Sequence, residues 1–129
     1  MSDYFVEKLA TFDRALKNFK ESLLANPSQL ERDGAIHRFE YCYDLAWETL
    51  KFYLQDRGII DLYSPKSVFS AAYAEKVIDD EAIWSTIITK RNLSVHTYNQ
   101  KLADSIFSEL PEYYNAMFIL LKTLVGKFI

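Results

Sequence analysis

The sequence predicts an all-α protein, an antiparallel, up-and-down bundle of four helices with one short extra helix. First, 50% of the 129 residues are hydrophobic and 16% are aromatic, which provides enough apolar side chain for a core. Second, three Gly and three Pro are too few for a turn-rich β fold or a disordered chain. Third, apolar residues recur at steps of three and four, which is the period of a helix with one buried face. The length fits a single domain over residues 1–129.

A first helix is predicted from Phe5 to Leu23, where apolar residues alternate at steps of four and three. Ser2 or Asp3 can cap its start, because short polar side chains accept hydrogen bonds from the first free backbone N–H groups. A break is expected at residues 26–28, since they include a proline.

A second helix is expected from about Leu30 to Arg57, and Gly58 is the expected left-handed residue that stops it. Residues 59–63 then form a loop over the bundle. Ser64 and Pro65 are typical of a helix cap followed by a first helical residue, which predicts a short helix up to about Lys76.

A further helix is expected after Asp79 or Asp80, which can cap it, and capping is also the expected role of the acidic run 79–81. The last helix is predicted from near Asn99 almost to the C-terminus. Pro111 lies inside it and predicts a kink or a short break. Three long helices and one interrupted helix therefore make up the predicted bundle.

The charge balance and the single cysteine limit the function classes. A net charge of −3 and a pI near 5.4 argue against a general affinity for nucleic acid, although a local basic site stays compatible with them. Cys42 cannot form an internal disulfide and is expected to be a buried small hydrophobe. No run reaches the roughly 18 apolar residues that a membrane span needs, and no secretory signal is visible. We expect a soluble, cytoplasmic protein without membrane contact.

Residues 90–98 are dense in polar groups and fall between two apolar helices. On a regular helix, Arg91 and Tyr98 share a face, whereas His96 points about 140° away from Arg91. Either the helix unwinds near residues 94–96, or Arg91 and His96 act on opposite sides of one cleft. β-Branched residues at 95 and 97 favour unwinding. A symmetric dimer could also gather two copies of each residue into one site.

The spacing of Arg91, His96 and Tyr98 matches the R-x4-H-x-Y motif of HEPN proteins, the higher-eukaryote and prokaryote nucleotide-binding family. Nearly the whole chain resembles the subgroup called nucleotidyltransferase substrate-binding proteins. The other segments that carry the resemblance are residues 38–41, 46–51 and 64–69, and Trp84. The resemblance implies a helical bundle that forms a homodimer and acts with a minimal nucleotidyltransferase protein as its partner.

In related pairs the HEPN protein is a ribonuclease toxin, and the nucleotidyltransferase is the antitoxin that attaches AMP to the motif tyrosine. The resemblance therefore implies that Arg91 and His96 are catalytic, that RNA is the substrate and that Tyr98 is the modification site. The expected activity is a metal-independent endoribonuclease, for which we expect no cofactor and no metal site.

The residue types suit that chemistry. Cleaving RNA without metal needs a base for the 2′-hydroxyl proton, and imidazole titrates close enough to neutral pH to let His96 act as one. The planar guanidinium of Arg91 can hold two phosphate oxygens at once. Asn92 lies one helical turn from His96 if the helix persists, and it could then orient the imidazole.

A polar stripe follows the second helix at steps of three and four. Its members are Asp33, His37, Glu40, Asp44 and Glu48. The stripe could hold Arg91 in place or join the site, with Glu40 and Asp44 in supporting roles, or it could form a solvated outer face or a dimer contact. His37 has no second His or Cys at ligand spacing, so a zinc site is rejected.

Rival hypotheses remain. Arg91 could simply be a charge at a helix C-terminus, with His96 and Tyr98 packed in a loop. The chain has no Gly-rich phosphate loop, so it is not itself a nucleotidyltransferase. It could be a non-catalytic subunit that binds a substrate or a nucleotide for the partner enzyme, or a structural dimerisation protein.

Overall fold

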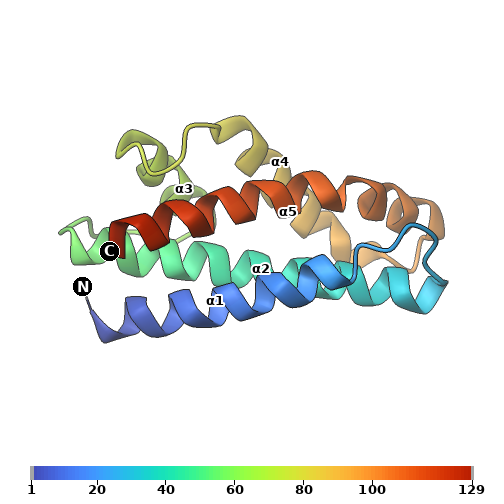
Figure 1. Ribbon diagram of the computed structural model, residues 1–129. Helices are drawn as coiled ribbons and strands as arrows, with labels where there is room; N and C mark the ends of the chain where they lie inside the picture. The colour runs from blue at the N-terminus through green and yellow to red at the C-terminus, as the bar shows by residue number, and fades with distance from the viewer. Residues whose placement is uncertain (1, 129) are drawn as a thin grey trace.

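The computed structural model describes residues 2–128, and these residues form five α-helices and one short 3-10 helix. In chain order the elements are α1 (Asp3–Glu21), α2 (Gln29–Asp56), α3 (Pro65–Ala74), α4 (Glu81–Leu93), η1 (Ser94–His96) and α5 (Gln100–Phe128). The three long helices α1, α2 and α5 lie side by side; α2 and α5 run in the same direction, and α1 runs antiparallel to both (Figure 1). The predicted all-α bundle is confirmed.

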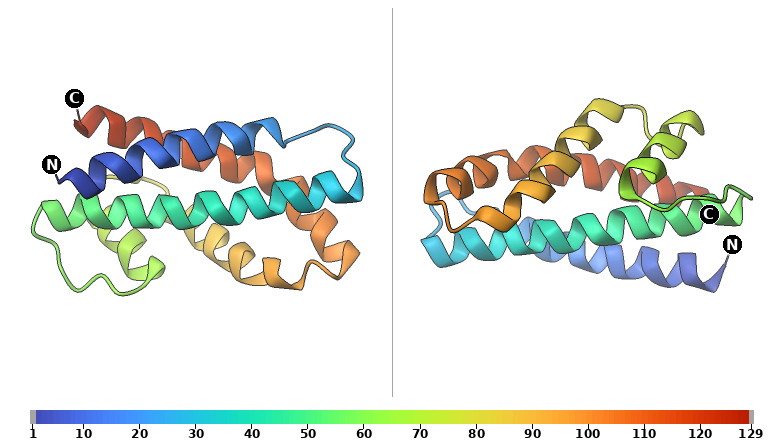
Figure 2. Two further views of the ribbon diagram at one scale, coloured as in Figure 1. Left: turned by 90° about the horizontal axis from the view of Figure 1, so that it is seen from below. Right: turned by 180° about the vertical axis from the view of Figure 1, so that it is seen from behind.

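The fourth position of the bundle is shared by α3 and α4. Both short helices lie on the side of α2 and α5 that faces away from α1 (Figure 2). α3 packs against α2, and α4 packs against α5. The predicted interrupted helix is therefore this pair, with the connection between them at residues 75–80.

Side-chain caps fix where each helix begins. Ser2, Ser28, Ser64 and Asp80 each accept a hydrogen bond from a backbone N–H in the first turn of the helix that follows. Asn99 does the same for α5, because its Oδ1 accepts from the Leu102 N–H at 3.1 Å. The expected caps at Ser2, Ser64 and Asp80 are confirmed.

Helix ends differ more from the sequence predictions. α1 ends at Glu21, two residues before Leu23, and α3 ends at Ala74 and not at Lys76. Gly58 stops α2 with a φ of 86°, as predicted. α5 continues unbroken through Pro111, so the prediction of a break there is wrong. An exposed proline can remain in a long helix when both flanking turns are held by packing against the core.

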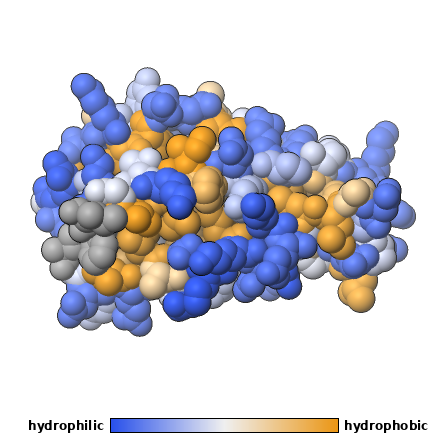
Figure 3. Space-filling view, viewed as in Figure 1, coloured by the Kyte–Doolittle hydropathy of each residue, from blue (hydrophilic) through white to orange (hydrophobic). Residues whose placement is uncertain are grey.

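Aromatic side chains make up much of the core. Phe19 contacts Phe39, and Phe39 contacts Tyr113, so α1, α2 and α5 are joined through a row of rings. Phe69 of α3 stacks on Trp84 of α4 with ring centroids 4.4 Å apart. On the face drawn in Figure 3, apolar residues form a broken band between charged ones.

Cys42 is fully buried, as predicted. Burial raises the pKa of its thiol to about 12, since an ionised thiolate would lose its hydration. The thiol therefore stays protonated and packs as a small apolar group.

A buried arginine lies at the end of the bundle where α2 and α5 begin. Arg32 is 4% exposed, and its guanidinium contacts Asp104 at 2.5 Å and Asp33 at 2.9 Å. Because Arg32 lies on α2 and Asp104 on α5, this pair fastens the two helix starts together. No helix between residues 2 and 128 combines the length and the apolar character needed to cross a bilayer.

Candidate functional site

The polar segment lies where α4 ends. α4 stops at Leu93, residues 94–96 continue as the 3-10 helix η1, and a turn leads into α5 at Gln100. The Asn99 N–H donates to the His96 carbonyl at 3.0 Å and closes that turn. The unwinding predicted near residues 94–96 is confirmed, and it places Arg91 on α4 but His96 and Tyr98 on the connection to α5.

Arg91 is held against α2. Its Nη1 lies 3.5 Å from Glu40 Oε2, and the two side chains are 28% and 22% exposed. Asp44 lies one turn further along α2 and is half-buried. Burial raises the pKa of the Asp44 carboxyl, and the nearby positive charge of Arg91 offsets only part of that rise. Arg91 thus faces two carboxylates in a partly dry environment.

Ser94 connects the same carboxylate to the turn. It is 3% exposed, and its hydroxyl contacts both Glu40 Oε2 and, at 2.7 Å, the Arg91 carbonyl oxygen. Sequence reasoning did not single out Ser94. Its position three residues after Arg91, where a serine hydroxyl can reach back to the backbone of the previous turn, was the available signal.

His96 and Tyr98 project into solvent next to each other. Their ring centroids are 5.8 Å apart with perpendicular planes, and Tyr98 is 84% exposed. Asn92 is also exposed, and within residues 2–128 no hydrogen bond joins it to His96. The expectation that Asn92 orients His96 depended on a continuous helix, and this condition is not met because α4 ends between the two residues.

Lys90, the residue before Arg91, is tied to a different helix. Its Nζ lies 3.4 Å from Glu109 Oε2 on α5, and the buried Tyr113 hydroxyl donates to that same oxygen at 2.5 Å. Burial, together with Glu109, raises the pKa of Tyr113. The two adjacent basic residues at the end of α4 are therefore anchored to different helices, Arg91 to α2 and Lys90 to α5.

The structure divides the polar stripe of α2. Glu48 pairs with Lys8 of α1 at 2.9 Å, so this end of the stripe faces away from Arg91. His37 is 81% exposed, and its Nδ1 lies 3.9 Å from Glu40 Oε1. Only the middle of the stripe, Glu40 and Asp44, faces Arg91. In the described part of the chain, no group of three or more His, Cys, Asp or Glu side chains is placed to hold a metal ion.

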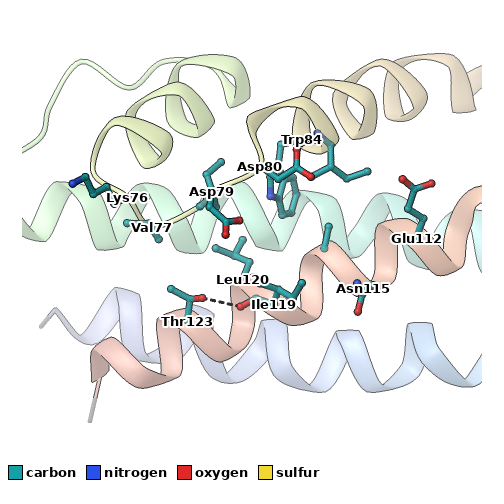
Figure 4. A pocket seen from close by; sticks show the side chains of 13 residues that line it. Lys76, Val77, Asp79, Asp80, Trp84, Glu112, Asn115, Ile119, Leu120 and Thr123 are labelled. Atoms are coloured by element: carbon teal, nitrogen blue, oxygen red, sulfur yellow. Dashed lines mark hydrogen bonds between the residues drawn. The ribbon is translucent and has the colours of Figure 1, made fainter.

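A pocket of about 450 Å³ lies at the other end of α4, between the α3–α4 connection and α5 (Figure 4). Buried apolar residues, among them Trp84 and Leu120, form its floor. Charged and polar residues form its rim, namely Lys76, Asp79, Asp80, Glu112 and Asn115. Sequence reasoning did not predict this pocket, because its walls come from two segments, within residues 76–84 and 112–123, that are far apart in the chain.

A helical bundle whose interrupted helix ends in an Arg-x4-His-x-Tyr segment is the arrangement of a HEPN-type protein. Residues 7–125 match the family model described as nucleotidyltransferase substrate binding protein like, and the chain belongs to that family.

Known proteins agree with this assignment. The chain is 30% identical over 84 residues to the probable ribonuclease HepT of Haemophilus influenzae, and the aligned part covers 62% of this chain and 58% of that relative. The chain thus spans less than two thirds of the relative's length.

Two solved structures share the fold. A crystal structure of a protein from Thermus thermophilus superposes with a TM-score of 0.83 at 36% identity, covering 88% of this chain and 98% of the other. HI0074 from Haemophilus influenzae, described as having the fold of a substrate binding domain of a nucleotidyltransferase, gives a TM-score of 0.81 at 25% identity. The superposition covers 90% of this chain and 98% of the HI0074 chain.

Proposed function

We propose that this chain is the metal-independent endoribonuclease toxin of a toxin–antitoxin pair and that a minimal nucleotidyltransferase is its partner. The observation that carries the proposal is the geometry at the end of α4. Arg91 is anchored by Glu40, and the break that follows leaves His96 and Tyr98 exposed side by side. The similarity to a probable ribonuclease supports it.

The proposed reaction is an internal phosphoryl transfer in RNA. His96 removes the proton of a 2′-hydroxyl, the 2′ oxygen forms a bond to the adjacent phosphorus, and the bond from phosphorus to the 5′ oxygen breaks. The 5′ oxygen takes up a proton and leaves as a hydroxyl, and the other product carries a 2′,3′-cyclic phosphate. Arg91 stabilises the negative charge that develops on the phosphorane oxygens.

The ion pair with Glu40 suits Arg91 to that task. A guanidinium has five N–H donors, and one carboxylate oxygen occupies only part of them. The 28% of the side chain that remains exposed can meet a phosphate. Holding Arg91 in one place before substrate arrives reduces the conformational entropy that is lost on binding.

A homodimer forms part of the proposal. Apolar side chains near the site are exposed without a cover, with Val95 at 62%, Tyr41 at 52% and Leu93 at 38%. A two-fold interface over this surface would bring two copies of Arg91 and His96 close together. Light scattering at micromolar concentration tests this point, and a monomeric mass would contradict it.

Tyr98 is the proposed site of silencing. Its phenol oxygen would attack the α-phosphorus of ATP on the partner nucleotidyltransferase, with pyrophosphate leaving and the phenol proton passing to a base. At 84% exposure the hydroxyl is open to a partner enzyme, and it lies beside His96. The attached nucleotide is bulky and anionic, so it would block the approach of an RNA phosphate.

The test of the activity is RNA cleavage in EDTA by protein made without its partner, with Tyr98 shown by mass spectrometry to be unmodified. His96→Ala and Arg91→Ala should each reduce the rate by about 100-fold or more. Arg14→Ala, which removes an exposed arginine from α1, is the matched control and should cleave like the wild type. Cleavage that stops in EDTA, or that persists in both site variants, would contradict the proposal.

The test of the modification compares two tyrosines. Tyr98→Phe should prevent AMP attachment by the partner and leave cleavage intact. Tyr63 is as exposed as Tyr98, at 85% against 84%, so Tyr63→Phe is a matched control that should be modified normally. Attachment that continues in Tyr98→Phe would place the modification elsewhere.

A second candidate function is a non-catalytic subunit that binds a substrate or a nucleotide for the nucleotidyltransferase. The pocket at the start of α4 favours it, because an apolar floor with a few polar groups at the rim is typical of small-molecule sites. If unmodified wild-type protein cuts no RNA, this candidate takes the lead.

A further inference from the structure

The proposed cleavage requires two proton transfers, and the motif residues of one chain supply only one of them. His96 accepts the proton of the 2′-hydroxyl, but the departing 5′ oxygen also needs a proton. An imidazole is well suited to both roles near neutral pH. The sequence contains two histidines, and the second is His37 on α2. His37 is therefore the candidate for the second proton transfer, a role that rests on the proposed function.

His37 belongs to the same charged cluster as Arg91. The two oxygens of Glu40 divide their contacts, with Oε1 lying 3.9 Å from His37 Nδ1 and Oε2 lying 3.5 Å from Arg91 Nη1. Ser94 also contacts Oε2. Glu40 therefore lies between the imidazole on one side and the guanidinium on the other, and it links His37 to the residue expected to bind the phosphate.

The register of the helices places both histidines at the same level of the bundle. α2 and α4 run in opposite directions (Figure 1). From the contact between Ser94 and Glu40, His96 is two residues onward, or about 4 Å at the 3-10 rise of about 2 Å per residue. His37 is three residues back along α2, or about 4.5 Å at about 1.5 Å per residue. Because α2 and α4 are antiparallel, moving toward the C-terminus from Ser94 and toward the N-terminus from Glu40 leads to the same end of the bundle.

The exposure of His37 leaves it free to meet a substrate. Its side chain is 81% exposed, and its only ion-pair contact within residues 2–128 is with Glu40 through Nδ1. Glu40 can therefore steady one edge of the ring while Nε2 faces solvent. His96 is exposed as well, so both imidazoles are accessible to an RNA substrate.

We propose that His37 is the general acid of the reaction and that it delivers its Nε2 proton to the departing 5′ oxygen while His96 takes the 2′-hydroxyl proton. The phosphorus–O5′ bond breaks as the O2′–phosphorus bond forms. The reaction leaves His96 protonated and His37 neutral, and exchange with water restores both.

The test uses two RNA substrates of one sequence, one of which carries sulfur in place of the bridging 5′ oxygen at the cleaved linkage. A thiolate leaves without needing a proton, so it bypasses a general acid. His37→Gln should cleave the oxygen substrate about 100-fold more slowly than wild type. It should cleave the sulfur substrate at nearly the wild-type rate. His96→Ala should stay slow on both substrates, because the 2′-hydroxyl proton must still be removed.

Controls separate this role from a loss of structure. His37 is exposed, so His37→Gln should keep the helical circular dichroism and the Tm of the wild type. Gln55→Ala removes an exposed polar side chain at the far end of α2 and should cleave both substrates normally. A His37→Gln variant that cleaves the oxygen substrate normally, or that is equally slow on both, would overturn the assignment of His37. Failure of the wild type to cleave either RNA would instead overturn the proposed function itself.

Discussion

The two ends of α4 differ in the kind of chemistry that they can support. At its end, Arg91 is ion-paired to Glu40 and joined to the turn by Ser94, and the residues that follow are exposed. At its start, Asp80 caps the helix beside a pocket whose floor includes Trp84. The first end presents an anchored guanidinium beside exposed ionisable and aromatic groups, whereas the second presents an apolar hollow with a charged and polar rim.

This difference shows why a family name taken from binding and a relative named as a ribonuclease are both compatible with one fold. A helix of 13 residues separates a charged site from an apolar one, so variants can alter either end by itself.

The largest expected effect is on stability at the pocket end. Trp84→Ala removes a ring that stacks on Phe69 and should lower the free energy of unfolding by about 3–5 kcal/mol. Urea denaturation measures this loss. The milder Trp84→Phe should keep the stacking and lose less stability. If the comparison of the two ends holds, Trp84→Phe cleaves RNA at the wild-type rate, and a large loss of cleavage would show that the two ends are coupled.

At the charged end, the expected effect is on the rate. Glu40→Ala frees the Arg91 guanidinium and removes the partner of Ser94, and a misplaced charge-stabilising group should slow RNA cleavage by about 100-fold. Glu48→Ala removes a carboxylate of the same helix that pairs with Lys8, and it should leave the rate unchanged. Equal rates for the two variants would mean that Glu40 does not position Arg91.

Removal of the Ser94 hydroxyl should have a smaller effect on stability. Ser94→Ala leaves the Arg91 carbonyl and one oxygen of Glu40 without this donor, at a cost of about 1–2 kcal/mol in the free energy of unfolding. Ser85→Ala, an exposed serine on α4, should change stability by less than about 0.5 kcal/mol. Equal denaturation midpoints for the two variants would rule out a structural role of the Ser94 contacts.

The smallest expected effect is a pH dependence at Asp44. Burial raises the pKa of this carboxyl above its usual 3.8, so the folded state holds the proton more tightly than the unfolded state does. The contribution of Asp44 to stability is therefore complete below pH 3.8 and is lost as the pH rises through the folded pKa. Asp44→Asn should raise Tm slightly at pH 7 and should reduce the decrease of stability with rising pH. A lower Tm at pH 7 would show that attraction to Arg91 outweighs burial.

Sequence periodicity and caps predicted most of the fold because they are local. Steps of three and four located the long helices, and Ser64, Pro65 and Asp80 located the starts of the short ones. The break before His96 was also foreseeable, from β-branched residues after Arg91. The short break expected at Pro111 is absent because the packing of a 29-residue helix outweighs the loss of one backbone hydrogen bond.

The candidate site was less predictable, because it depends on which neighbours each helix has. Glu40 and Glu48 occupy equivalent places in the polar stripe, yet one faces Arg91 and the other faces Lys8 of α1. Which of the two carboxylates lies near Arg91 depends only on how the helices pack around α2. Ser94 was overlooked for the same reason, since its burial and its contact with Glu40 of α2 depend on how the helices pack.

The anchoring of the turn that carries Tyr98 bears on how an attached group would act. The turn is fixed at one end by Ser94 and at the other by Asn99, and the nearby starts of α2 and α5 are joined by Arg32 and Asp104. With both ends of the turn held, a nucleotide on Tyr98 would block access to the site without moving the turn itself. Silencing would then leave the backbone unchanged, and cutting the nucleotide away would restore the open state at once, with no refolding step.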